Sequence, residues 1–287
     1  SIDEPIADSS FLPTFKLCKN TSDYVKTCLT GDGSDELLQG YSIFQAMYYA
    51  LFVKKIVPNF LIDRTFNLLK KNISYKYDYM SFEFKLKKFF SGIRFDSSEW
   101  VDEWLSYSSV GHINKLLGTN FDRSEILSES ENVWNESDSN LVFDKITNYF
   151  IKLYFSNNIL TKIDRASMLN GIETRVVFTD LDLFNFLIKL PQKFKKNLLN
   201  SKIILKKTFM NKIPKKILNR PKQGFAYPVL NALDFLNKEN FFKKDSYIND
   251  DFLKKICDDH FNKKIDHKMI LWAYVNFKSY INPKSTI

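Results

Sequence analysis

Apolar residues recur at every third or fourth position along most of the chain, a spacing that places them on one face of a helix. Leu183, Leu187 and Leu190 form one such stripe, while Lys189 falls outside it. This pattern predicts a mostly helical protein. The expected helices cover residues 11–19, 36–53, 61–71, 80–91, 98–105, 141–155, 159–169, 180–190, 201–210, 250–260 and 268–280.

One early segment has a different pattern. Residues 25–30 (VKTCLT) are rich in β-branched side chains and run into Gly31-Asp32-Gly33-Ser34. The sequence therefore predicts a buried strand, a glycine turn and a new helix that begins at Asp35. A lone parallel-type strand needs neighbours for its backbone groups, so we expect its sheet to lie upstream of Ser1.

The most polar interval, residues 122–140, is rich in Ser, Glu and Asn and predicts a mobile loop. Over the 287 residues, 44% are apolar and 26% charged, which indicates a globular chain. Gly and Pro number eight each, which argues against a β-sandwich or barrel with many tight turns. The three Cys are far apart, which excludes a disulfide scaffold or a zinc cluster and fits a reducing cytoplasm.

The net charge of +9 comes almost entirely from Lys, because only six of the 42 basic residues are Arg. Nucleic-acid readers favour Arg forks, and the Lys pairs here sit within apolar helical patterns. Solvated helix faces are the simpler interpretation, with non-specific affinity for polyanions left open. We expect no specific nucleic-acid partner and no membrane partner.

Candidate chemistry begins with the acidic turn, residues 30–36 (TGDGSDE). It places Asp32, Asp35 and Glu36 at the carboxyl end of a strand, where open α/β sheets bind ligands. Carboxylates repel a bare phosphate, so their natural partner there is a phosphate bridged by Mg²⁺. The alternative is that Asp35 and Glu36 only favour the dipole of the following helix.

Two later segments carry further charge. In residues 162–178, four charged residues that follow Lys162 stand among apolar ones, and burying such charges is costly unless they are paired. They are either substrate contacts or structural ion pairs: Asp164, Arg165, Glu173 and Arg175. Residues 219–228 (NRPKQGFAYP) predict a loop whose Lys222 either reaches a polyphosphate or is simply a surface cation.

Four segments match one family's motifs in order. DEPIADSS at the start is similar to D-E-P-x-x-D-S-S, and TGDGSDELLQGY to S-G-D-G-x-D-E-L-F-G-G-Y. LTKIDRASMLNGIETRVVF is similar to L-x-K-x-D-R-x-S-M-x-x-x-x-E-x-R-x-P-F, and RPKQGFAYP to R-x-K-Q-G-F-x-x-P. Residues 1–235 therefore resemble the synthetase domain of the asparagine synthetase family, which belongs to the ATP pyrophosphatases. Residues 236–287 form an expected helical tail without a motif.

The resemblance implies a mostly α remnant of a doubly wound α/β ATP-pyrophosphatase domain, of the adenine nucleotide alpha hydrolase type. It implies ATP and Mg²⁺ as cofactors, and formation of an amide through an acyl-adenylate, with aspartate as acceptor and ammonia from glutamine. On this basis Asp32, Glu36 and Lys222 are the catalytic residues. Thr30, Gly31, Asp35 and Lys222 bind ATP, and Asp35 holds the metal.

The departures from the family pattern also carry expectations. Val177 replaces Pro and Gln39 replaces Gly, and we expect both to be tolerated. The family's S-G-G-x-D-S pyrophosphate loop and the Cys nucleophile of its glutaminase part do not occur here. We therefore expect residues 1–287 to be the C-terminal two-thirds of a synthetase domain, inactive alone and partnered by upstream glutaminase and pyrophosphate-loop segments.

The residues do not fix the acceptor, which leaves room for another carboxylate, such as a sugar acid of a surface glycan. A degenerate binding or assembly module is a second interpretation of the same motifs, and a homodimer is left open as well. His112, His260 and His267 lack metal-ligand spacing, so we expect them to serve packing.

Overall fold

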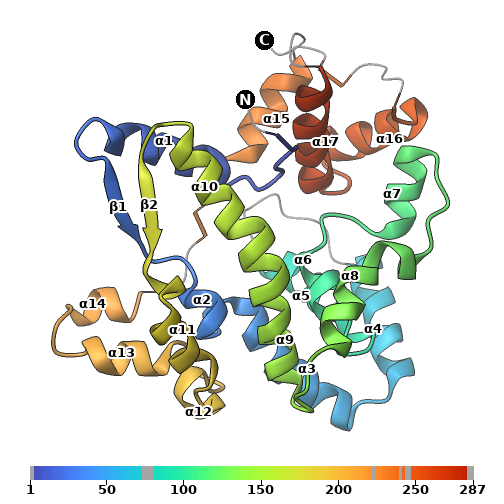
Figure 1. Cartoon of the computed structure of the whole chain (residues 1–287). Coiled ribbons are helices and arrows are strands. Elements are labelled where there is room, and N and C mark those ends of the chain that lie inside the picture. Colours follow the sequence, from blue (N-terminus) through green and yellow to red (C-terminus); the bar gives the residue numbers. More distant parts are fainter. Residues whose placement is uncertain are drawn as a thin grey trace. The chain divides into compact units, whose positions relative to one another are not determined.

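The computed structural model describes residues 3–72, 81–220, 224–225, 227–238, 241–242 and 247–282. These residues form mostly helices and one two-stranded parallel sheet (Figure 1). The chain divides into two compact units. The first contains residues 10–52 and 132–226, and the second contains residues 2–9, 53–131 and 227–287.

The first unit carries both strands and all the described candidate site residues. Its elements are α1 (Phe11–Ser22), β1 (Thr27–Thr30), α2 (Ser34–Leu37), the start of α3 (Ser42–Ile56), the end of α8 (Arg123–Asn135), α9 (Val142–Tyr149), the π-helix η1 (Phe150–Leu160), α10 (Thr161–Met168), β2 (Glu173–Val176), the 3-10 turn η2 (Val177–Thr179), α11 (Leu181–Ile188), α12 (Gln192–Lys195), α13 (Ile203–Phe209) and α14 (Lys215–Leu218).

The sheet has one covered face. β1 and β2 run parallel, with Thr30 opposite Val176. Helices α1 and α10 lie beside the strands in Figure 1, and their Cys18 and Ala166 pack with Cys28 of β1. Leu29 points to the other face and is 74% exposed. The alternating side chains of β1 thus contribute only every second residue to the core.

A second apolar cluster supports the turn after β1. Leu37 and Leu38 at the end of α2 are fully buried and pack with Leu187 of α11. Phe155 and Ile159 of η1 form a neighbouring cluster with α10. The short helix α2 is therefore fixed by hydrophobic burial and not by its own length, which is too small for a stable isolated helix.

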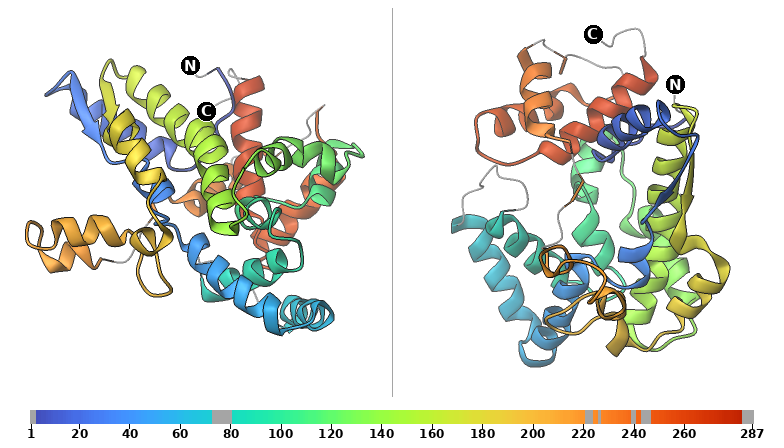
Figure 2. Two further views of the ribbon diagram at one scale, coloured as in Figure 1. Left: turned by 60° about the horizontal axis from the view of Figure 1, so that its bottom comes forward. Right: turned by 90° about the vertical axis from the view of Figure 1, so that its left-hand side faces the viewer.

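The second unit is entirely helical in the residues described. It contains the rest of α3, α4 (Asn59–Asn72), α5 (Phe82–Ile93), α6 (Trp100–Leu105), α7 (Val110–Leu117), most of α8, α15 (Val229–Lys238), α16 (Asp250–Phe261) and α17 (Lys268–Ile281). The last three helices share one core, centred on Leu233, Leu253 and Leu271. Figure 2 shows these three helices from two further sides, in the orange and red of the C-terminal end of the colour bar.

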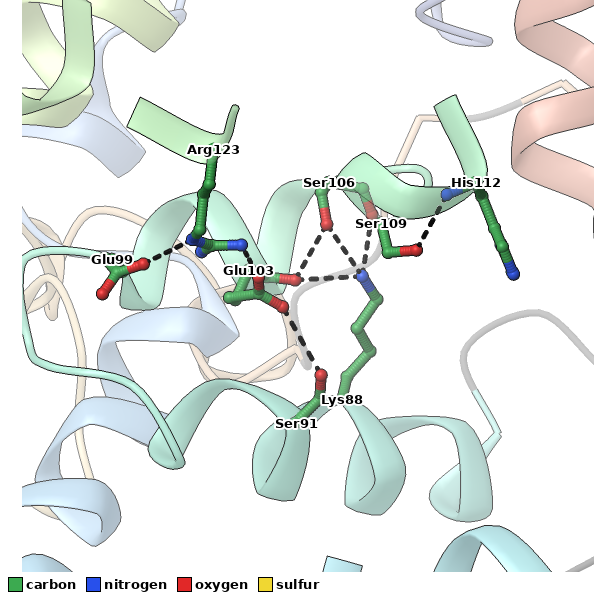
Figure 3. Close-up of polar contacts among 8 residues, drawn as sticks. All are labelled: Lys88, Ser91, Glu99, Glu103, Ser106, Ser109, His112 and Arg123. Atoms are coloured by element: carbon green, nitrogen blue, oxygen red, sulfur yellow. Dashed lines mark hydrogen bonds and ion pairs between the residues drawn. The ribbon is translucent and has the colours of Figure 1, made fainter. Parts of the chain in front are cut away.

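Polar contacts join α5, α6 and α8 in this unit (Figure 3). Lys88 of α5 donates to the backbone oxygens of Glu103 and Ser106 at 3.0 and 2.7 Å. These carbonyls lie at the end of α6, where a cation is favoured by the helix dipole. Arg123, the first residue of α8, bonds the carboxylates of Glu99 and Glu103.

Most predicted helices are present, and the mostly helical character of the chain is confirmed. The predicted loop over 122–140 is wrong, because α8 occupies residues 123–135. The segment is polar because Val133 is the only residue of α8 that is buried, so its other side chains can be polar without loss of the helix. The predicted helix over 36–53 is interrupted at Gln39 and Gly40, and the one over 141–155 passes into η1.

The prediction of one lone, buried strand is also wrong. β2 pairs with β1, and each strand alternates exposed and half-buried residues. The sequence ETRV of β2 is short and carries two charges, so its pattern contains no strand signal.

No helix among the described residues has both the length and the apolar run needed to cross a lipid bilayer.

Candidate functional site

The acidic turn follows β1 directly and closes into α2. Gly33 has a φ of 90°, in the left-handed region that favours glycine. A Cβ at this position would lie 2.9 Å from both Phe155 and Phe178. The turn therefore fits closely against η1 and η2, and glycine is required both for the backbone angle and for the space.

The carboxylates of this turn differ in burial. Glu36 is 1% exposed and Asp35 is 9% exposed, whereas Asp32 is half-buried. Thr30 ends β1, and its Oγ1 is buried without a hydrogen-bond partner in the described part of the chain. A buried hydroxyl without a partner is costly, so this atom is suited to a ligand that completes the site.

Asp35 is paired with a lysine far away in the sequence. Lys202 Nζ lies 2.8 Å from Asp35 Oδ1 and 2.9 Å from Ser34 Oγ. Both side chains of the ion pair are largely shielded from solvent. The sequence did not indicate Lys202, because 36 lysines obscure any single one and its partner lies in a different segment.

Gly40 makes this close approach possible. A Cβ there would lie 1.8 Å from Asp35 Oδ1 and 2.4 Å from Lys202 Cε. The backbone N–H of Gly40 also donates to the Asp35 carbonyl at 2.8 Å. Any side chain at position 40 would therefore separate Asp35 from Lys202.

Glu36 faces an aromatic group instead of the ion pair. The Tyr41 hydroxyl donates to Glu36 Oε1, and the Tyr41 ring stacks on Phe150 with centroids 5.6 Å apart. Burial raises the pKa of the Glu36 carboxyl above its ordinary value, although the hydrogen bond from Tyr41 opposes this. Burial and the nearby Glu36 charge raise the pKa of Tyr41.

The π-helix η1 supplies three aromatic side chains to this region, Phe150, Tyr154 and Phe155. Tyr154 meets the Tyr41 ring edge-on at 5.9 Å, and Phe155 lies against Gly33. A π-helix winds more widely than an α-helix and is often found at functional sites. Eleven residues are in this conformation, and their periodicity alone does not distinguish it from an α-helix.

The four charged residues that follow Lys162 in residues 162–178 form two local pairs. Arg165 bonds Asp164 on α10, and Arg175 bonds Glu173 on β2, each at 2.8 Å. All four side chains are more than one-third exposed. The pairs are therefore solvent-accessible, and the cost of burial considered from the sequence does not arise.

Lys222 lies outside the described residues, so its predicted position opposite Asp35 remains a prediction. Val177, in place of Pro, opens the 3-10 turn η2 and is partly exposed. Gln39, in place of Gly, has a φ of 55° and is completely buried. This left-handed angle explains why glycine suits the position, and it makes Gln39 a strained residue in this chain.

The acidic turn fits a metal that arrives with its ligand better than a resident metal. In the described ranges, no group of three or more His, Cys, Asp or Glu side chains is arranged to hold a metal ion. Mg²⁺ bound with a nucleotide needs only one or two protein carboxylates, because phosphate oxygens and water complete its shell. Asp35 supplies one such carboxylate, and the unpartnered Thr30 hydroxyl is suited to bond an oxygen of the ligand.

The comparison with known families decides the relationship of the chain. The family model described as Asparagine synthase matches residues 1–282. The chain belongs to the asparagine synthase family. The resemblance predicted from the four ordered motifs is thereby confirmed.

Relatives within the asparagine synthase family are distant. An asparagine synthetase [glutamine-hydrolyzing] 1 of Bacillus subtilis is 25% identical over 96% of this chain and 43% of its own length. A putative asparagine synthetase of Mycobacterium tuberculosis is 26% identical over 79% of the chain and 34% of its own length. The chain thus spans less than half of these relatives. No solved structure gives a significant match.

Proposed function

We propose that this chain carries the nucleotide-binding part of an ATP-dependent amide-forming ligase. The observation that carries the proposal is the buried Asp35–Lys202 pair at the turn that follows β1, whose last residue, Thr30, has an unpartnered hydroxyl in the described part of the chain. This edge of an α/β sheet is where ligands bind, and the same turn matches the asparagine synthase family. The doubly wound sheet of the ATP pyrophosphatases is part of the proposal.

The proposed reaction has two steps. An oxygen of the acceptor carboxylate attacks the α-phosphorus of ATP, and the bond from that phosphorus to the bridging oxygen breaks to release pyrophosphate. Ammonia then attacks the acyl carbon, and AMP leaves with the electron pair of the acyl–oxygen bond. The half-buried carboxylate of Asp32 is suited to accept a proton from the attacking amine.

The remaining roles follow from charge and burial. Asp35 would hold Mg²⁺ on the pyrophosphate group, while Thr30 and Gly31 line the nucleotide site. Lys202 and Lys222 would counter the negative charge that builds up on the departing phosphates. Glu36, being 1% exposed, is assigned to positioning Tyr41 and the turn, in place of direct contact with the substrate.

The proposed acceptor is aspartate, with ammonia derived from glutamine by an associated glutaminase segment. We expect residues 1–287 alone to turn over poorly, because the sequence contains no pyrophosphate loop. Two other outcomes would replace the proposal. One is an acceptor of another kind, such as a sugar acid, and the other is a purely non-catalytic binding role. The test does not depend on residues 236–287, on homodimer formation or on a cytoplasmic location.

The test measures binding before turnover. Isothermal titration with ATP and MgCl₂ should show one site on the wild-type protein, and Asp35→Asn should weaken binding at least tenfold. The control Asp63→Asn changes a carboxylate paired with Arg94 in the other unit and should bind normally. Exchange of labelled pyrophosphate into ATP with a panel of carboxylates then identifies the acceptor. Equal binding by wild type and Asp35→Asn would contradict the proposal.

A further inference from the structure

Two strained residues are linked to Asp35. Gln39, Lys202 and Lys263 are the non-glycine residues with positive φ in the described part of the chain. Lys202 pairs with Asp35, and Gln39 directly precedes Gly40, whose N–H donates to the Asp35 carbonyl. Left-handed backbone angles cost free energy in residues with a Cβ, and they persist only where surrounding contacts hold them. Gln39 and Lys202 must therefore be held by contacts with their neighbours.

A second side-chain amide, that of the half-buried Gln192, holds the buried Gln39. Gln39 Nε2 donates to Gln192 Oε1 at 2.8 Å, and Gln192 Nε2 donates back to Gln39 Oε1 at 2.6 Å. Gln39 Nε2 also donates to the hydroxyl of Thr147 at 3.1 Å. We call the reciprocal pair Gln39–Gln192 the amide clamp.

The amide clamp continues toward Lys202 through further hydrogen bonds of the first unit. Gln192 Nε2 donates to the Tyr48 hydroxyl at 3.1 Å, and that hydroxyl donates to the Lys196 carbonyl at 3.1 Å. Lys196 pairs with Ser201 in an antiparallel bridge, which closes a short loop. Lys202 is the next residue, so the clamp fixes the backbone from which the Lys202 side chain reaches Asp35.

The other end of the clamp fixes the carboxylate. Gln39 is followed by Gly40, which packs against both Asp35 and the Lys202 side chain. One hydrogen-bonded unit therefore determines the position of both members of the ion pair. A glycine at position 39 would adopt the same backbone angle without strain, but it could form no such link.

We propose that the amide clamp Gln39–Gln192 is a positioning device that holds Lys202 on Asp35 and so sets the affinity of this site for a magnesium-bound pyrophosphate group. The ligand part of this proposal rests on the function proposed above. The positioning part does not, because it concerns only where the Lys202 ammonium lies. Both glutamines act through their bonds to other protein groups, so the proposal assigns them as positioning residues.

The first measurement needs no ligand. The protein is treated with an amine-acetylating reagent, and mass spectrometry compares the acetylation rate of Lys202 with that of the exposed Lys207. In Gln192→Ala, Lys202 should react several times faster than in wild type, while Lys207 is unchanged. Gln192→Glu keeps an acceptor for Gln39 Nε2 and should give a smaller increase. An unchanged Lys202 rate in Gln192→Ala overturns the proposal.

The second measurement uses inorganic pyrophosphate with MgCl₂ as the probe. Loss of supporting contacts around a metal site commonly costs at least tenfold in affinity, so Gln192→Ala should bind about tenfold more weakly by titration calorimetry. The matched control is Asn114→Ala, which breaks a side-chain amide network with Thr119 and Phe121 in the other unit. This control should lose stability without losing affinity.

The labelling measurement tests the positioning of Lys202, and the pyrophosphate measurement tests the proposed function. If wild type binds no pyrophosphate, the proposed function fails, and the labelling arm still decides whether the clamp positions Lys202. If Gln192→Ala does not fold, Gln39→Gly removes the clamp while relieving the left-handed strain, and both arms are repeated with it. Equal affinity of Gln39→Gly and wild type for magnesium pyrophosphate contradicts the ligand part.

Discussion

Among single residues, Gly40 decides whether Asp35 and Lys202 can meet. In Gly40→Ala the new Cβ would begin 1.8 Å from Asp35 Oδ1, so the carboxylate or the loop must move. We expect a loss of about 1–3 kcal/mol in the free energy of unfolding, typical of overpacking, together with weaker magnesium pyrophosphate binding. Urea titration and calorimetry measure the two effects.

Gly111→Ala provides the control for that substitution. Gly111 lies in α7, and a Cβ there meets no atom within 4 Å. Alanine is the better helix former by up to about 1 kcal/mol, so this variant should be as stable as wild type or more so. Equal losses in the two variants would show that the crowding at Gly40 has no special effect.

Glu36 gives a prediction that depends on pH. Burial raises the pKa of its carboxyl in the folded protein, so the charged form is disfavoured by folding. The contribution of Glu36 to stability is therefore complete at acidic pH, below the ordinary carboxyl pKa, and is lost as pH rises through the raised value. Gln in its place still accepts the Tyr41 hydroxyl without carrying a charge.

We therefore expect Glu36→Gln to be more stable than wild type at pH 8, with the difference shrinking toward pH 4. Urea unfolding followed at several pH values measures this gap. A gap that is constant across the range, or that grows toward low pH, contradicts the assignment of a raised pKa. Because Tyr41 remains bonded in both proteins, the comparison isolates the charge.

Residue-level prediction from the sequence succeeded where the chemistry is local. The acidic turn lies at the end of a strand as predicted, because strand, glycine turn and helix start are all encoded within a dozen neighbouring residues. Lys202 was missed, because its role depends on a contact with Asp35 that spans more than 160 positions. Lys222 remains a prediction.

Among the helices and strands, helix α8 could not be predicted from the sequence, because the composition of residues 122–140 is polar. Helix α8 was expected to be a loop, yet its first residue, Arg123, bonds Glu99 and Glu103 (Figure 3). The Arg123 guanidinium also lies over the Phe95 ring at 4.4 Å. These partners are distant in the sequence, so no local pattern reveals them. For the same reason β2 was missed, since its strand conformation depends on pairing with β1.

Arg123→Ala tests this role. Removing the guanidinium leaves two partly buried carboxylates, Glu103 of α6 and Glu99 at its N-cap, without their cation and uncovers the Phe95 ring. We expect the second unit to lose about 1–2 kcal/mol of stability, since hydrogen bonds to charged groups exceed the worth of exposed ion pairs. Intrinsic fluorescence during urea unfolding provides the measurement, because Trp100 and Trp104 lie in α6.

The control for Arg123 is Arg64→Ala, an exposed arginine of α4 in the same unit. Its loss should change stability by less than about 0.5 kcal/mol, as is usual at exposed positions. If both arginine variants unfold at the same urea concentration as wild type, α8 is not held to α6 by these ion pairs.

For the molecule as a whole, the sequence indicated the family and the helical class but not the division into two units. The motifs lie mainly in the first unit. The second unit contains all three histidines, which have no motif spacing and were expected to serve packing. The structure brings them together: the rings of His112 and His267 are 6.0 Å apart, and the backbone N–H of His267 donates to His260 Nδ1 at 3.3 Å.

This grouping predicts that the second unit loses stability in mild acid. Burial is the main cause that lowers the pKa of His260 and His267 in the folded protein, and Asp266 opposes it for both. Burial also lowers the pKa of His112, with help from Lys115, Lys70 and Lys255. The unfolded chain therefore binds more protons than the folded one below the ordinary histidine pKa of about 6.5.

Stability is accordingly expected to be constant above about pH 7 and to fall as pH decreases through 6.5. His260 contributes most directly, because its Nδ1 must stay unprotonated to accept the His267 N–H. In His260→Asn the Asn Oδ1 can take the place of Nδ1 as acceptor, and it does not titrate. Urea unfolding between pH 8 and pH 5 should thus show a shallower decline for His260→Asn than for wild type. Parallel curves would mean that acid acts through other groups, since the two chains differ only in that imidazole.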